Sequence, residues 1–211
     1  MDERKTDVPI QSENAKSIQK PHSDPGVHNK RVAVGFDGFI DIVVRPVRVL
    51  GKGGPEFFTT IEQFGQYIAG KASLSCSIDL DKIGERPGGN MPNYVKALAA
   101  LGIETDCIGT VGYPERNSLF DDLAVSGRVR GIANPGVSNA LEFRDGKVFL
   151  ACNGDVDQVN YRLLEERIGR DGLIQWLIGA DCLSLLNWSE MKQSTSIWQG
   201  LLDNEIGRAH V

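Results

Sequence analysis

The sequence predicts an α/β fold in which a parallel sheet is covered by layers of helices. Short apolar segments alternate along the chain with segments of helical spacing, which is the pattern typical of parallel sheets. Two carboxylates, Asp37 and Asp41, follow the first apolar segment, and a glycine pair, Gly88 and Gly89, precedes a predicted helix. These two features indicate where a ligand would bind.

The first predicted strand covers residues 31–34 and leads into the segment Gly-Phe-Asp-Gly-Phe-Ile-Asp at 35–41. Open α/β sheets bind ligands beyond the carboxyl ends of their strands, and Asp37 and Asp41 lie at such an end. Solvated loop carboxylates are the alternative interpretation at this point.

Residues 42–50 continue as a β-rich segment that contains Pro46. Proline cannot donate to a sheet, so we expect an edge strand or a flap here and not a central strand. A turn at 51–55, a helix at 59–69 and short strands at 74–80 and 82–86 are predicted to follow.

The stretch from 88 to 112 reads as a loop, a helix, a second loop and a strand. We expect Asn90 to be the N-cap of the helix, Pro92 to lie in its first turn and Gly102 to end it. The strand is predicted over 105–110. The bare backbone at Gly88 and Gly89 would let a ligand touch the main chain, although a plain tight turn would use the same residues.

The second half of the chain contains a hairpin signal, in which an Asp-Gly turn near 144–146 joins β-rich segments at 137–143 and 147–151. Helices are predicted at 118–124, 161–168 and 173–178, a strand at 180–186, and a last helix at 191–202 capped by Ser189.

The composition suits one globular core, because the chain has 211 residues, of which 41% are hydrophobic, and a net charge of -5. Without a basic stripe, a nucleic-acid partner is not expected, and without a long apolar segment neither is a membrane partner. The four cysteines are expected to be buried thiols in a cytoplasmic protein. The polar residues 1–29 read as a disordered tail.

Other site motifs are absent from the sequence or incomplete. Neither the dinucleotide fingerprint nor the phosphate-binding loop ending in Gly-Lys-Ser/Thr occurs. Asn153, Asp155 and Asp157 alternate like part of a calcium loop but lack its glycine and its glutamate. No metal site is therefore expected.

Taken together, the segment at 35–41 and the stretch at 88–112 resemble the ribokinase-like (PfkB) family of carbohydrate kinases. The resemblance implies a ribokinase-like parallel-sheet sandwich over 30–211, incomplete at its C-terminus. It also implies a small β-flap, or lid, formed by about 42–50 and 137–151.

The resemblance also implies roles for particular residues. Asp41, with Asp37 as its neighbour, would accept hydrogen bonds from sugar hydroxyls. Gly88 and Gly89 would give close backbone approach, and Asn90 and Asn93 would bind hydroxyls. Complete enzymes of the family would transfer the γ-phosphoryl group of ATP or another nucleotide, with magnesium, to a sugar. We also expect a homodimer through the lid.

One family feature is missing from these 211 residues. The Gly-Ala-Gly-Asp turn that supplies the general base does not occur, so no catalytic residue is assigned. We expect a truncated or frame-disrupted kinase, and the coding DNA beyond Val211 tests this. A non-catalytic sugar-binding or regulatory module and a plain nucleotide-binding domain remain the alternatives.

Overall fold

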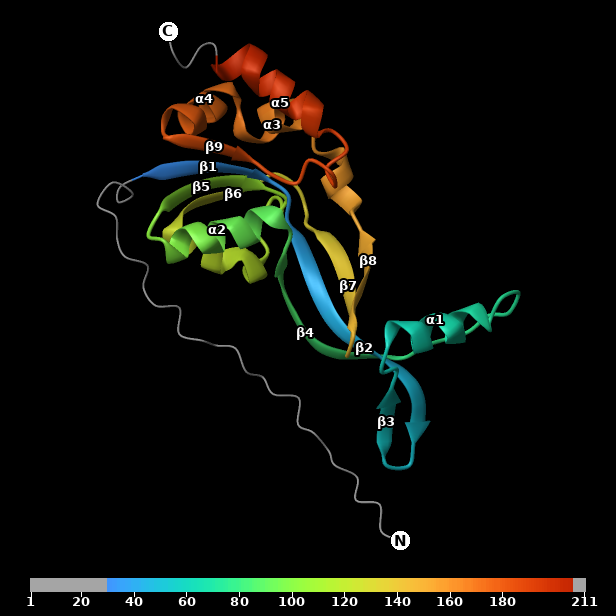
Figure 1. Ribbon diagram of the computed structural model, residues 1–211. Helices are drawn as coiled ribbons and strands as arrows, with labels where there is room; N and C mark the ends of the chain where they lie inside the picture. The colour runs from blue at the N-terminus through green and yellow to red at the C-terminus, as the bar shows by residue number, and fades with distance from the viewer. Residues whose placement is uncertain (1–29, 207–211) are drawn as a thin grey trace.

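The computed structural model describes residues 30–206, which form two sheets with helices packed around them (Figure 1). The predicted disordered tail, residues 1–29, lies outside the described residues, as do residues 207–211.

The first sheet is parallel, with the strand order β6-β5-β1-β9. Its strands are β1 (Arg31–Phe36), β5 (Glu104–Gly109), β6 (Gly127–Gly131) and β9 (Cys182–Leu185). Parallel pairing places all four carboxyl ends at one edge. The prediction of an α/β fold with a parallel sheet is therefore confirmed.

Helices cover both faces of this sheet (Figure 1). On one side lie α2 (Asn90–Ala100) and the 3₁₀ helix η1 (Ser118–Ser126). On the other side lie α3 (Tyr161–Ile168), α4 (Arg170–Ile178) and α5 (Ser194–Leu201), which continues as η3 (Leu202–Ile206). Strand β1 serves both cores, because Val32 and Val34 pack on the α2 side while Ala33 and Phe36 pack on the opposite side.

The second sheet begins where β1 ends. Its long strand β2 (Phe39–Gly51) pairs with β4 (Leu80–Gly88), β7 (Gly136–Phe143) and β3 (Gly54–Phe57), and β7 pairs with β8 (Gly146–Cys152). Helix α1 (Ile61–Ala69) packs on this sheet through an apolar cluster around Phe58 and Phe143. The hairpin of β7 and β8 was predicted from its Asp-Gly turn.

Two strand predictions are wrong. Residues 42–44 lie in a central part of the second sheet, because β2 runs there between β4 and β7. Pro46 is tolerated because the pairing with β7 ends at Val44 and the pairing with β3 begins at Val47. The strand expected at 74–80 begins only at Leu80.

Three local predictions also need correction. Of the four free cysteines only Cys107 is buried, because the other three lie at strand ends or in a loop. Helix α5 begins at Ser194, so Ser189 does not cap it. The segment at 118–124 forms a 3₁₀ helix and not an α-helix.

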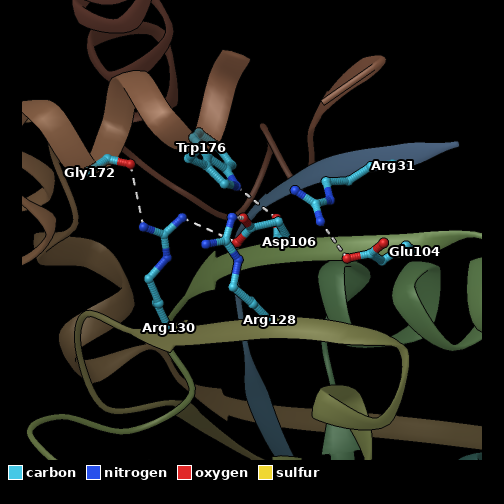
Figure 2. Close-up of polar contacts among 7 residues, drawn as sticks. All are labelled: Arg31, Glu104, Asp106, Arg128, Arg130, Gly172 and Trp176. Atoms are coloured by element: carbon cyan, nitrogen blue, oxygen red, sulfur yellow. Dashed lines mark hydrogen bonds and ion pairs between the residues drawn. The ribbon is translucent and has the colours of Figure 1, made fainter. Parts of the chain in front are cut away.

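An ion cluster around one buried carboxylate ties the edge strand β6 to the sheet (Figure 2). Asp106 on β5 is 1% exposed, and its carboxylate accepts hydrogen bonds from Arg128 at 2.5 Å and Arg130 at 3.2 Å. Its backbone carbonyl accepts the indole N–H of Trp176 at 2.7 Å, which fixes α4 on the same strand. One residue thus holds a strand and a helix.

Replacing Asp106 with Asn should lower the free energy of unfolding by about 1–3 kcal/mol, because two guanidinium groups lose a charged acceptor in a buried place. Urea unfolding measures the loss. Glu104→Gln is the matched control on the same strand, since the Glu104–Arg31 pair at 2.7 Å is partly exposed on both sides. The control should lose about 0–1 kcal/mol. Equal losses in the two variants would contradict the role of the buried cluster.

Candidate functional site

Asp37 joins three elements at the carboxyl edge of the first sheet. The residue follows β1 and is completely buried. Its carboxylate accepts the backbone N–H groups of Asn90 at 2.6 Å and Met91 at 2.9 Å, the first two residues of α2. It also accepts the side-chain amide of Asn187, just beyond β9, at 2.9 Å. A carboxylate at a helix N-terminus is favoured by the helix dipole and by the free N–H groups.

This arrangement corrects the predicted cap. Helix α2 begins at Asn90, so its N-cap position is Gly89. Glycine has no side chain that could cap the helix. The capping group instead comes from Asp37, which lies 53 residues earlier in the sequence. The two predicted parts of the site are therefore joined by a direct hydrogen bond.

Burial raises the pKa of Asp37 above its ordinary value of 3.8, because desolvation outweighs the opposing hydrogen bonds from Met91, Asn90 and Asn187. The three bonds leave little capacity for further partners. Asp37 is thus placed to hold the backbone of the site, and its carboxylate does not lie open to solvent.

Both members of the glycine pair lie against a carboxylate. A Cβ atom on Gly88 would come within 2.5 Å of the Asp41 carboxylate, and one on Gly89 within 2.5 Å of Asp37 Oδ2. Gly89 also has a φ of 93°, which favours glycine. Asp41 and Asp37 can therefore lie this close to residues 88 and 89 only because both are glycines.

Asp41 lies on β2, where it is opposite Arg86 of β4 and Ser138 of β7. Within residues 30–206, no hydrogen bond or ion pair involves its half-buried carboxylate. Burial raises its pKa, and the charges of Arg86 and Lys147 act in the opposite direction. Such a carboxylate is a ready acceptor for the hydroxyl groups of a ligand.

The two predicted asparagines differ in their contacts. Both have exposed side chains on the first turn of α2. Asn93 donates its amide to the carbonyl of Gly89 at 2.8 Å and so braces the glycine turn, while the backbone N–H of Asn90 bonds to Asp37. The structure thus gathers all six predicted residues around the Gly88–Gly89 turn.

Asn187 and Ser138 belong to the same group of residues but were not predicted as site residues. Asn187 has a φ of 58°, and asparagine tolerates this left-handed conformation better than most residues do. An asparagine directly after an apolar strand was the available signal. Ser138 is 5% exposed and lies beside Asp41 because β7 pairs in parallel with β2. The parallel pairing of β2 with β7 has no signal in the local sequence by which it could be predicted.

Within the described part of the chain, no three His, Cys, Asp or Glu side chains gather closely enough to hold a metal ion. Likewise, no helix among residues 30–206 is long and apolar enough to cross a membrane.

The sequence matches a known family over most of its length. The model of the prokaryotic ketohexokinase family matches residues 12–206. A curated ketohexokinase from Haloferax volcanii is 28% identical over 178 residues, which cover 83% of this chain and 47% of that protein. The chain therefore spans about half the length of this relative.

Solved structures with a similar fold include that of a protein named Sa239, with a TM-score of 0.53 and 14% identity. The match covers 87% of this chain and 52% of Sa239. A ribokinase from Arabidopsis thaliana, solved with ribose and ATP, aligns with a TM-score of 0.48 and 15% identity over the same shares of the two chains. At 14% identity the likeness to Sa239 is one of fold.

Replacing Asp37 with Asn should lower the free energy of unfolding by about 1–3 kcal/mol, because the amide of Asn would face a backbone N–H donor. The deficit should be larger at pH 4 than at pH 7. The pKa of Asp37 in the folded protein is raised above the ordinary value of 3.8. The stability that Asp37 contributes is therefore greatest below pH 3.8 and falls as the pH rises from there through the folded pKa.

Urea unfolding at both pH values measures the difference in free energy of unfolding between the wild type and Asp37→Asn. The other carboxyl groups titrate in both proteins, so their contributions cancel in this difference. A loss of stability that grows with pH would contradict this prediction, because it would mean that the hydrogen bonds lower the pKa of Asp37 by more than burial raises it.

Proposed function

The chain belongs to the prokaryotic ketohexokinase family, and on this basis we propose that it supplies the sugar-binding part of a sugar kinase. The family match confirms the ribokinase-like resemblance that the motifs at 35–41 and 88–112 indicated. In the proposed reaction, the γ-phosphoryl group of a nucleotide passes to a hydroxyl group of a ketohexose.

The observation that carries this proposal is the carboxylate of Asp41, which lies against the backbone of Gly88 and has no hydrogen-bond or ion-pair partner among residues 30–206. A neutral polyol offers hydroxyl donors but no charge, so a fixed and partly desolvated acceptor binds it well. The absence of a side chain at Gly88 and Gly89 lets the sugar ring come close to the main chain.

The remaining residues complete the proposed site. Asn90 and Asn93 would bind further hydroxyl groups from the first turn of α2. Asp37, with Asn187, would hold that turn in place through the bonds at 2.6–2.9 Å. Ser138, beside Asp41, would line the wall formed by β7.

We further propose that the second sheet acts as a lid. Asp41 and Ser138 lie on strands that continue away from the carboxyl edge, in the segments 42–50 and 137–151 (Figure 1). Closure over a bound sugar would exclude water, so that the phosphoryl group would go to sugar and not to solvent.

A nucleotide with magnesium would supply the phosphoryl group in the complete reaction. Magnesium bound with a nucleotide is held by one or two carboxylates together with phosphate oxygens, and we assign none of the described residues to it. We assign no general base among these residues. A nucleotide-dependent kinase would act in the cytoplasm, where nucleotides are available.

Replacing Gly88 with Ala should weaken fructose binding by about tenfold or more, because the new methyl group displaces the Asp41 carboxylate and the loss of a charged hydrogen bond costs about 1.5–3 kcal/mol. Gly84→Ala is the control on the same strand, where a Cβ atom would meet nothing within 4 Å. Isothermal titration calorimetry measures the fructose affinity of both variants.

Equal fructose affinity in the two variants, or no fructose binding by the wild type, would contradict the sugar site. Repeating the fructose titration with and without nucleotide separates a kinase from a non-catalytic sugar-binding module, because only the kinase should bind nucleotide as well as sugar. Turnover is not expected of these residues, since no general base is assigned among them.

The lid should also mediate self-association, because Val49, Leu50, Phe149 and Leu150 are large apolar residues that are 48–70% exposed. Changing Phe149 and Leu150 to Ser together should shift the protein towards monomer in sedimentation velocity. Val125→Ser is the control, since Val125 is 87% exposed but lies on η1, away from the lid. An unchanged dimer in the double variant would exclude this surface.

A further inference from the structure

A cavity opens at the carboxyl edge of the first sheet, at the ends of β5 and β6. It has a volume of about 360 Å³, within the range of small-molecule sites. Its walls include Tyr113 and Asn134 from the loops after these strands, Asp155 and Gln158 from η2 (Gly154–Gln158), and Leu163 and Arg167 from α3. The cavity shares no lining residue with the Gly88–Gly89 turn.

Arg167 is held in place by an aromatic ring, and among residues 30–206 its guanidinium group donates no hydrogen bond. Its guanidinium carbon lies 3.9 Å from the ring centroid of Tyr113. Its nearest carboxylate is that of Glu166, at 3.9 Å, which is too far for a hydrogen bond. By contrast, Arg31 and Arg45 reach their carboxylates at 2.7 and 2.6 Å.

An arginine in this state is suited to bind an anion. Stacking on the aromatic ring has already restricted the side chain, so little further conformational entropy is lost when a ligand binds. The planar group can then donate two parallel hydrogen bonds to a phosphate.

Across the cavity, Asp155 is also anchored. One of its oxygens, Oδ2, accepts the backbone N–H of Asn134 at 3.1 Å and its side-chain amide at 3.0 Å. Among the residues described, Asp155 forms no ion pair with Arg167. The cavity thus keeps a cation and an anion apart, and the second oxygen of Asp155 can accept hydroxyl donors.

We propose that this cavity binds a phosphate monoester of a polyol, with the phosphate on Arg167 and the hydroxyl groups on Asp155 and Gln158. A sugar phosphate has this chemistry. If the proposed kinase activity is correct, the product of the reaction belongs to this class, and the cavity would let the product regulate the enzyme. The site itself does not depend on that activity.

The test is calorimetry on the full chain with fructose 1-phosphate, fructose and inorganic phosphate as separate probes. Arg167→Gln should weaken the binding of fructose 1-phosphate by about tenfold or more. Arg162→Gln is the control, because Arg162 is an exposed arginine on the same helix but does not line the cavity. Arg167→Lys should give an intermediate loss, since it keeps the charge but not the paired donors.

Further variants separate this site from the proposed sugar site and from a plain anion site. Gly88→Ala should keep a fructose 1-phosphate site that Arg167→Gln removes, even where it abolishes fructose binding. Asp155→Asn should weaken the binding of fructose 1-phosphate but not that of inorganic phosphate. Equal binding by Arg167→Gln and the control, with both variants folded by circular dichroism, would overturn the proposal. Loss of binding in Gly88→Ala would overturn it as well.

Discussion

The buried carboxylate of Asp37 is the interaction on which the candidate site depends. It bonds to the first two backbone N–H groups of α2 and to the amide of Asn187. These bonds join the ends of β1 and β9 to the start of a helix on one face of the sheet. A buried carboxylate without such partners would cost far more free energy, so the geometry of the turn and the ionisation of Asp37 are coupled.

The glycine pair follows from this constraint. Because Asp37 draws the start of α2 close to β1, the backbone of Gly89 lies against one carboxylate and that of Gly88 against another. Asp37 is saturated and closed to solvent, whereas Asp41 is unpaired and partly open. Two similar acids thus differ in their tasks, with Asp37 shaping the turn and Asp41 proposed to receive the substrate.

Features with a local signal could be predicted from the sequence. The helix at 161–168 and the hairpin around Asp145 depend on periodicity and turn chemistry within a few residues, and the structure has both. Features that depend on distant pairing could not be predicted. Neither the capping of α2 by Asp37, nor the Asn187 bond, nor the place of Ser138 beside Asp41 can be seen before the strand order is known. The central place of residues 42–44 in the second sheet could not be predicted for the same reason.

The most direct test of the account is an NMR titration of the isotopically labelled chain with fructose, followed through backbone amide shifts. The largest changes should fall on the amides of Gly88, Gly89 and Asn90, with smaller ones at Asp41 and Ser138. Changes centred on α4 or α5, or an unaffected Gly88–Asn90 segment at saturating sugar, would contradict the claim that the carboxylate-held glycine turn is the substrate site.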